Sequence, residues 1–133
     1  MSLVNWNPEL SVYIDELDDQ HKAWLNIINE LHDAMLKGKS NDVLEKTIIR
    51  LNDYTKKHFS TEESYLEKYN YPEIDSHKEL HKNFIKRISE ITEKFSQGKN
   101  AFLSIEIMEE LRDWLIKHIK SADKKYGEYI KKQ

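Results

Sequence analysis

Apolar residues recur at steps of three and four along four separate stretches of the chain, and this helical periodicity is the feature that most restricts its fold. The stretches run over residues 17–35, 44–62, 74–95 and 107–118. Glycine and proline, which interrupt helices, number only three and two in 133 residues. Short connections between helices favour antiparallel neighbours. The sequence therefore predicts an all-α fold, namely an up-down-up-down antiparallel four-helix bundle.

Residues typical of helix ends separate these stretches. Gly38 suits the end of the first helix, and Ser40-Asn41-Asp42 can cap the start of the second. Asn70-Tyr71-Pro72 ends the second helix, with Pro72 placed to open the third, and Asn100 precedes the fourth. We expect a single domain over residues 1–133, in which residues 18–133 form the bundle and residues 1–17 an extended N-terminal arm packed over it.

Composition excludes several classes of protein. The 21 basic and 24 acidic residues nearly balance, which argues against nucleic-acid and acidic-membrane partners. There is no cysteine, so disulfides and thiolate metal sites are excluded. No apolar run approaches the roughly 18 residues of a membrane span, and residues 1–8 lack the basic and apolar regions of a signal peptide. We expect a cytoplasmic protein.

Five of the six histidines, together with two carboxylates, are placed to meet at one end of such a bundle. In antiparallel helices, the starts of the first and third lie beside the ends of the second and fourth. The candidate residues occupy those four positions and mostly follow the apolar stripes. They are His21 in the first helix, His58 and Glu62 in the second, His77 and His81 in the third, and His118 and Asp123 in the fourth.

The spacing within each helix fits a shared site, with one exception. His58 and Glu62 are four residues apart, as are His77 and His81, so each pair stacks on one helical face. His118 and Asp123 are five residues apart. At ~100° per residue, their side chains would point about 140° apart around the axis of a regular helix. We therefore predict a π-type widening of the helix between them, a feature often found at functional sites.

Seven such groups buried together require compensation by metal ions, because unpaired buried polar groups are costly. They are too many for one tetrahedral zinc but suit two ions bridged by both carboxylates, with one coordination position open. Ligand type alone leaves iron, zinc, copper and nickel open. His32, three turns from His21 or ~16 Å along the helix, is too distant to share the site and is predicted to be structural.

The motifs that carry these residues resemble those of the hemerythrin family, specifically its bacterial single-domain members. They are His21, His58-Phe-Ser-Thr-Glu62, His77-Lys-Glu-Leu-His81 and His118-Ile-Lys-Ser-Ala-Asp123. Flanking phrases such as Asp19-Gln-His-Lys22 and Trp114-Leu-Ile-Lys-His118 are similar too, so the resemblance covers nearly the whole chain. One departure is Tyr13, where bacterial members commonly carry glycine.

The resemblance implies two iron ions, cycling between Fe2+ and Fe3+, with a bridging oxo or hydroxo group. By analogy one iron is held by His77, His81 and His118 and the other by His21 and His58, with Glu62 and Asp123 bridging. The implied function is reversible binding of dioxygen, as a carrier, store or scavenger and not as an enzyme. Other small diatomics or anions could bind at the open position. A dry pocket favours reversibility, and its expected wall residues are Leu115, Trp114, Leu25 and Phe59.

Three other functions remain open from the sequence. One is a sensor of oxygen or redox state that acts through a separate partner. Another is a di-iron oxidase, a peroxidase or a nitric-oxide-handling protein, although the Glu-x-x-His repeats of carboxylate-rich di-iron bundles do not occur here. The last is a metal-free interaction bundle.

Overall fold

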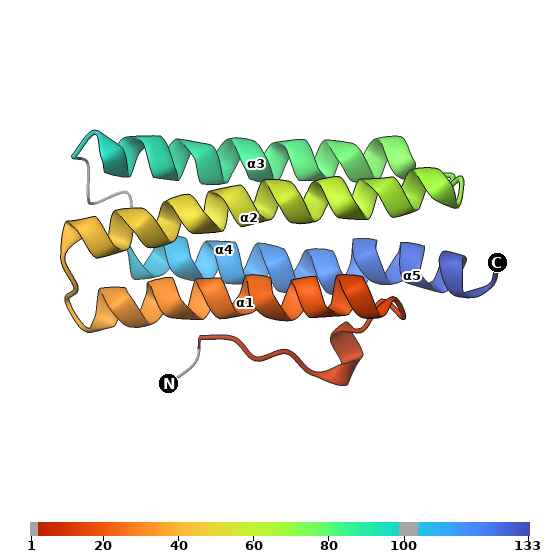
Figure 1. The fold of residues 1–133 in the computed structure, drawn as a ribbon, viewed down its shortest axis with the longest axis horizontal. Coiled ribbons are helices and arrows are strands. Elements are labelled where there is room, and N and C mark those ends of the chain that lie inside the picture. The colour runs from red at the N-terminus through yellow and green to blue at the C-terminus, as the bar shows by residue number, and fades with distance from the viewer. Residues whose placement is uncertain (1–2, 99–103) are drawn as a thin grey trace.

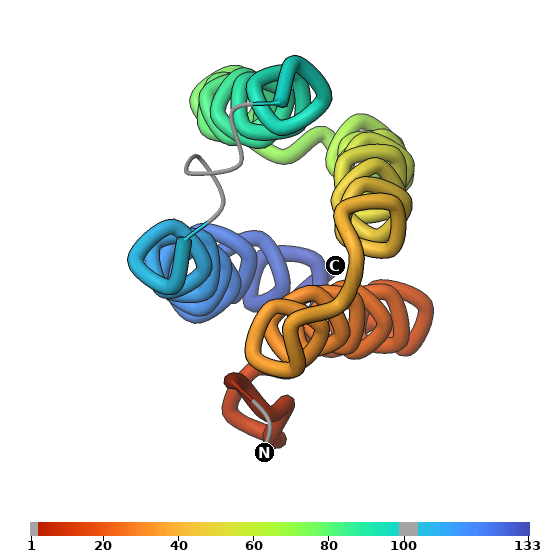
Figure 2. The backbone as a smooth tube through the Cα atoms, turned by 90° about the vertical axis from the view of Figure 1, so that its left-hand side faces the viewer, coloured from red at the N-terminus to blue at the C-terminus, as the bar shows by residue number. Residues whose placement is uncertain are grey.

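Four long helices pack antiparallel in the computed structural model, which describes residues 3–98 and 104–133. These are α1 (Asp15–Leu36), α2 (Asn41–Lys68), α3 (Ile74–Ser96) and α4 (Ile105–His118). A π-helical turn, η3 (Ile119–Asp123), and a short helix, α5 (Lys124–Lys131), continue the line of α4. Figures 1 and 2 show the up-down-up-down bundle, which confirms the predicted all-α fold. Within the described residues, no helix has both the length and the apolar character needed to cross a bilayer.

The helix ends agree with several local predictions. Gly38 follows α1 with a φ of 64°, a left-handed conformation that costs glycine little. The Ser40 side chain accepts a hydrogen bond from the Val43 amide at the start of α2. Beyond α2, Asn70 has a φ of 52°, and the Tyr71 amide donates to the Leu66 carbonyl. Each end therefore uses a residue type that satisfies the terminal backbone groups.

Two helix starts differ from the prediction. α1 begins at Asp15, not at residue 18, because its first turn gathers Asp15, Glu16 and Asp18, which are favourable at a helix N-terminus. Pro72 lies in the turn before α3, which starts two residues later at Ile74. Asn100, expected to precede the fourth helix, falls outside the described residues. α4 begins at Ile105, where Ser104 accepts a hydrogen bond from the Ile107 amide.

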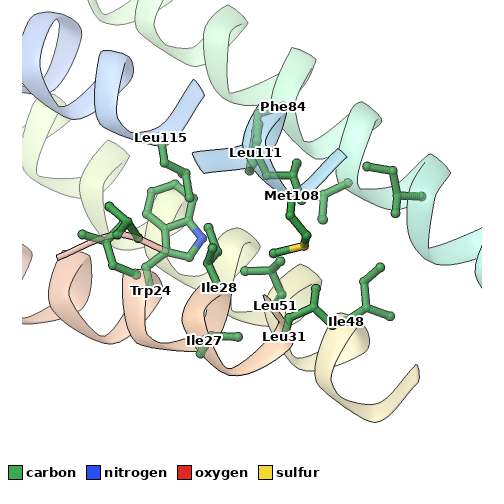
Figure 3. Close-up of a cluster of buried hydrophobic side chains, with 14 of the residues drawn as sticks. Trp24, Ile27, Ile28, Leu31, Ile48, Leu51, Phe84, Met108, Leu111 and Leu115 are labelled. Atoms are coloured by element: carbon green, nitrogen blue, oxygen red, sulfur yellow. The ribbon is translucent and has the colours of Figure 1, made fainter. Parts of the chain in front are cut away.

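The buried apolar side chains form two clusters. The larger occupies the middle of the bundle and includes Trp24, Ile28, Leu51, Phe84 and Leu111, as Figure 3 shows. The smaller one lies at the end that holds the starts of α1 and α3 and consists of Val12, Leu17, Leu66, Tyr71 and Tyr126. Along the helices the predicted site residues fall between the two, so they are covered by apolar side chains on both sides.

The N-terminal arm lies along the outside of α1 and includes a short 3-10 helix, η1 (Pro8–Leu10) (Figure 2). Its start is held by Asn29, which exchanges two hydrogen bonds with the Val4 backbone at 3.0 and 2.7 Å. Its end is held by the Asp18 carboxylate, which accepts from the Ser11 hydroxyl at 2.6 Å and from the Val12 amide at 2.8 Å. The arm thereby places Val12 over the end of the bundle that carries the site.

Candidate metal centre

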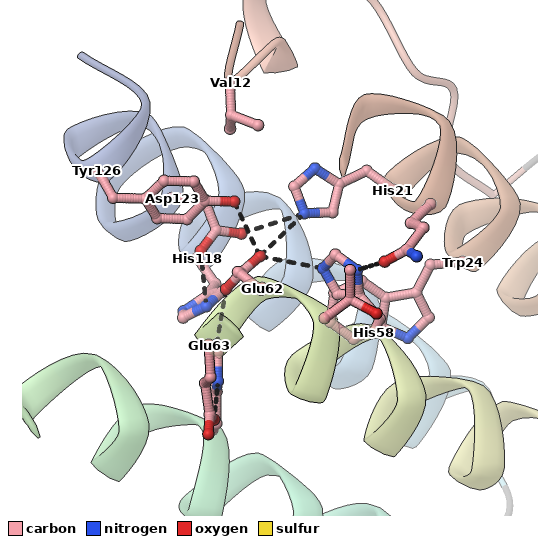
Figure 4. Close-up of polar contacts among 12 residues, drawn as sticks. Val12, His21, Trp24, His58, Glu62, Glu63, His118, Asp123 and Tyr126 are labelled. Atoms are coloured by element: carbon pink, nitrogen blue, oxygen red, sulfur yellow. Dashed lines mark hydrogen bonds and ion pairs between the residues drawn. The ribbon is translucent and has the colours of Figure 1, made fainter. Parts of the chain in front are cut away.

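The seven predicted side chains meet inside one end of the bundle and are buried (Figure 4). Ligand-type atoms of five of them lie within 4.8 Å of one another, and a second group with the same spacing shares one carboxylate with the first. The first group is Glu62, His77, His81, His118 and Asp123, and the second is His21, His58 and Glu62. His32 belongs to neither group, as its position along α1 predicted.

The predicted widening of the last helix is present. Residues 119–123 form the π-helical turn η3 between α4 and α5. The added residue in this turn brings Asp123 to the same side as His118, with Asp123 Oδ1 3.0 Å from His118 Nε2. The Asp123 side chain is fully buried, whereas a regular helix would direct it elsewhere.

The Glu62 carboxylate divides its two oxygens between histidines of the two groups. Oε1 lies 2.8 Å from Nε2 of both His77 and His81. Oε2 lies 3.1 Å from Nε2 of His58 and 3.5 Å from Nε2 of His21. Glu62 therefore stands between a set of imidazoles from α3 and a set from α1 and α2.

The Asp123 carboxylate repeats this arrangement from the opposite helix. Oδ1 lies 3.0 Å from Nε2 of both His77 and His118, and Oδ2 lies 3.3 Å from Nε2 of His21. Each Glu62 oxygen thus faces two histidines, whereas Asp123 presents one oxygen to two histidines and the other to His21. This is the placement that two bridging carboxylates need between two cations.

Most of these close contacts are not hydrogen bonds. His77 Nε2 does make one, to Glu62 Oε1 at 2.8 Å. The Nε2 atoms of the other four histidines and both oxygens of Asp123 are buried without a hydrogen-bond partner. Buried polar atoms left in this way are costly in a protein interior. Their convergence fits a donor set that holds cations, because nitrogen and oxygen lone pairs can then be satisfied together.

The charges of the site are strongly coupled. Burial disfavours a charged imidazole, but Asp123 and Glu62 outweigh it and raise the pKa of His21 to about 9 and of His77 to about 10. Burial lowers the pKa of His58, which favours its neutral form. Although burial acts against ionisation of Glu62, the surrounding histidines hold its pKa well below the usual range. Protons on His21 and His77 therefore compete with cations for the same nitrogens.

Two histidines have their outer nitrogens fixed by acceptors from α1 and α2. His58 Nδ1 lies 2.7 Å from Gln20 Oε1, and His81 Nδ1 lies 2.7 Å from Glu63 Oε2. Because these oxygens accept, each Nδ1 carries the proton, and the neutral ring leaves Nε2 free as a ligand atom. Such outer partners orient metal-binding imidazoles and raise their basicity.

A buried tyrosine supports the shared carboxylate. Tyr126, on α5 one turn beyond Asp123, donates a hydrogen bond from Oη to Glu62 Oε2 at 3.0 Å. Burial and the nearby carboxylates raise the pKa of Tyr126 well above its usual value, so the hydroxyl keeps its proton and donates. Gln20, Glu63 and Tyr126 were not among the predicted site residues. Each lies close to a predicted ligand in the sequence. Its hydrogen bond to a residue of another helix, however, depends on how the helices are rotated about their axes, which the sequence spacing does not determine.

Two of the four predicted pocket residues stack on histidines. The Phe59 ring lies parallel to the His81 ring, with centroids 3.7 Å apart and planes 5° apart. The Trp114 ring lies parallel to the His118 ring, at 4.5 Å and 14°. Both aromatic residues therefore cover the group of three histidines.

The other two predicted pocket residues, Leu115 and Leu25, are buried in the larger apolar cluster. Trp24 also covers the side with two histidines, since its ring centroid lies 5.0 Å from that of His58 and 6.3 Å from that of His21. The Trp24 indole donates to the Thr55 hydroxyl at 2.9 Å, which satisfies its polar atom and keeps this wall apolar. Periodicity placed Trp24 in the core without indicating this role.

The fold and site together define a helical-bundle protein with two adjoining groups of buried donor atoms, each of which could hold a metal ion. Residues 12–130 match the family model described as the hemerythrin HHE cation binding domain. The chain is 34% identical to a bacteriohemerythrin of Stenotrophomonas maltophilia, over 98% of this chain and 84% of that protein. It is 32% identical to a bacteriohemerythrin of Methylococcus capsulatus, over 96% of each.

Solved structures agree with this match. A wild-type hemerythrin crystal structure superimposes with a TM-score of 0.89 at 31% identity, covering 95% of this chain and 96% of the other. A myohemerythrin of Theromyzon tessulatum is 30% identical over 91% of this chain and 88% of its own. The chain belongs to the hemerythrin family.

Proposed function

We propose that this protein holds two iron ions at the described centre and binds dioxygen there reversibly, without acting as an enzyme. Membership of the hemerythrin family supports this function. The structural observation that carries it is the division of the carboxylate oxygens, since Glu62 and Asp123 each place one oxygen at each group of histidines.

In this proposal three histidines hold one ion and two hold the other. The first set is His77, His81 and His118, and the second is His21 and His58. Glu62 and Asp123 would be shared by the two ions. Because the second ion would have one histidine fewer, it would be the one with room for dioxygen. Ferrous ions bound here supply the electrons that reversible dioxygen binding requires.

The protein's own residues favour reversibility in two ways. Gln20 and Glu63 keep the ligand nitrogens of His58 and His81 unprotonated and correctly aimed. Trp24 and the apolar cluster behind it exclude water from the two-histidine side, and Tyr126 closes the opposite end of the site. A dry site of this kind limits proton supply to bound ligand, which would otherwise promote irreversible oxidation.

The test begins with an iron count and an absorption spectrum of the aerobically purified protein. We expect two irons per chain and the charge-transfer bands of an oxo-bridged ferric pair. The reduced protein should then gain and lose an oxygen-dependent spectrum over repeated cycles of oxygen and argon. Stoichiometric iron with rapid irreversible oxidation would favour an enzyme instead, and absence of iron after anaerobic ferrous reconstitution would refute the proposal.

A further inference from the structure

The seven residues of the centre are not equally shielded from solvent. His21, His58, Glu62 and Asp123 have no exposed surface, and His81 has 1%. His77 and His118 retain 3% and 5%. Solvent therefore reaches this cluster on one side, where α3 faces the end of α4 and the π-helical turn.

Two hollows open on that side. One, of about 280 Å³, has His77 in its lining together with Glu73, Ser76 and Lys125. The other, of about 180 Å³, has His118 in its lining together with Trp114 and Lys117. Both are also lined by Leu80, Ser121 and Ala122, so the same three side chains separate them. The two hollows are therefore neighbours and lie over His77 and His118, the two most exposed histidines of the centre.

Leu80 has a position that core packing does not explain. It lies on α3 between His77 and His81 in the sequence, is 40% exposed, and belongs to neither apolar cluster. The wall opposite Leu80 is the π-helical turn, where Ser121 and Ala122 are exposed or half-buried. A wide turn replaces the regular helical hydrogen-bond ladder there. The opening is thus bounded by one movable side chain and one irregular segment.

Two other approaches to the cluster are closed, and the hollow between α2 and α3 has none of the seven site residues in its lining. Trp24 covers the side of His21 and His58 and has no exposed surface. Val12 and Tyr126, also fully buried, cover the end of the bundle under the arm. An ion arriving by either way would have to displace core side chains, whereas the opening beside Leu80 needs only a rotation of an exposed leucine.

We propose that metal ions reach and leave the centre through the opening between Leu80 and the π-helical turn, and that Leu80 controls this exchange. The inference rests on the proposed function, because it presumes that the centre holds iron. It adds that the ion held by His77, His81 and His118 is the one that exchanges first with solvent. The ion beside Trp24 follows after the first has left.

A single cysteine at the opening tests this route. The labelled and unlabelled samples are then the same folded variant, so a folding defect cannot explain a difference between them. The chain has no cysteine, so Leu80→Cys supplies a single site for a bulky maleimide. Leu36→Cys is the matched control, because Leu36 is 61% exposed and lies at the end of α1 away from the centre. Each variant is loaded with Fe2+ anaerobically, half of the sample is labelled, and transfer of iron to a coloured ferrous chelator is timed.

We expect labelling at position 80 to slow iron transfer at least fivefold and labelling at position 36 to leave it unchanged. The variant Leu80→Ala, without label, should transfer iron to the chelator in two phases, one for each ion. Its first phase should be faster than that of the wild type. A readout independent of loaded iron is the uptake rate of Co2+ by the metal-free protein, which the position-80 label should also slow. Equal rates before and after labelling at position 80, in a chain that holds two irons, would overturn this route alone. A chain that takes up no metal would refute the proposed function instead.

The charge at the rim gives a second test with a defined sign. Lys125 is paired with Glu73 at 2.7 Å, whereas Lys117 is exposed beside the smaller hollow. A cation at this rim repels Fe2+ and attracts anionic chelators. Lys117→Glu should therefore speed Fe2+ uptake and slow release to an anionic chelator, and about 0.5 M salt should weaken both effects. If Lys117→Glu changed the rates of uptake and release in the same direction, or changed neither, exchange at this rim would be contradicted.

Discussion

Gly127 of α5 touches the backbone of Val12 in the N-terminal arm so closely that no side chain fits between them. A Cβ atom at Gly127 would lie 2.6 Å from the Val12 carbonyl oxygen and 3.1 Å from its carbonyl carbon. These are backbone atoms, which cannot rotate away as a side chain can. The arm and α5 are therefore held at a separation that only glycine allows.

Gly127→Ala should destabilise the protein through this contact. Overpacking of this kind costs about 1–3 kcal/mol, which exceeds the gain of up to ~1 kcal/mol from alanine's better helix propensity. Urea unfolding of the metal-free protein measures the net change. In a variant lacking residues 1–12 the clash is absent, so the same substitution should be neutral or stabilising. Equal destabilisation with and without the arm would show that the contact is not the cause.

Substitutions of the proposed ligands should reduce iron binding in a graded order. His58→Ala and His81→Ala each remove one donor nitrogen and should lower the iron count. Glu62→Ala should lower it further, because this carboxylate faces both groups of histidines. His32→Ala is the control and should leave the count near that of the wild type. Mass-spectrometric metal analysis decides the matter, and loss of iron in His32→Ala but not in His81→Ala would show the assignment to be wrong.

Glu63 should influence metal affinity without contacting the metal. Its carboxylate holds the outer nitrogen of His81 at 2.7 Å, and partners of this type are typically worth ~10–100-fold in affinity. Glu63→Ala should weaken Co2+ binding by about that factor, and Glu63→Gln by less, since an amide oxygen can still accept. Glu67→Gln, also on α2, changes the same charge away from His81 and serves as control. Chelator competition titrations give the affinities, and equal affinities for Glu63→Ala and Glu67→Gln would disprove the role.

The pair formed by Arg87 and Glu110 should contribute stability that depends on pH. Arg87 of α3 donates from Nε and Nη2 to the two carboxylate oxygens of Glu110 on α4, at 2.7 and 2.8 Å. The guanidinium lowers the pKa of Glu110 below 4.5, its unfolded-state value. A lowered carboxyl pKa contributes stability above the unfolded pKa, and that contribution is lost as the pH falls through the folded pKa.

Arg87→Gln should therefore reduce the free energy of unfolding by up to about 1 kcal/mol at pH 7, the range for a partly exposed ion pair. The difference from the wild type should shrink as the pH is lowered from 4.5 and vanish once Glu110 is protonated. Glu110→Gln should follow the same course. Urea unfolding of the metal-free proteins across this pH range tests the idea, and a difference that persists at acid pH would assign it to packing.

The sequence specified the position of the site more completely than its surroundings. Helical periodicity and antiparallel packing suffice to bring His21, His58, His77 and His118 to one end, because both depend on residue spacing alone. The five-residue step to Asp123 even required the π-helical turn that the structure contains. These features are local or topological, so one chain's sequence determines them.

The partners around the site depend on how the helices are rotated against one another, which spacing does not determine. Gln20 directly precedes the proposed ligand His21, and Glu63 directly follows Glu62. Their side-chain oxygens nevertheless accept from His58 and His81, which lie on other helices. The same limit applies to the walls, where Trp114 stacks on the three-histidine side and Trp24 covers the other. The start of α1 at Asp15 was missed because the acidic first turn extends further back than the apolar stripe indicated.

Tyr13 adopts a φ of 67°, a left-handed conformation in which a bulky residue is strained. It is held there by a hydrogen bond from its hydroxyl to Glu128 at 2.9 Å and by the ammonium groups of Lys124 and Lys131 over its ring. Glycine would adopt this φ without strain. Tyrosine is strained there, but its side chain links the arm to α5. Loss of these contacts would weaken the link between the arm and α5, while Asn29 and Asp18 would still hold the arm to α1.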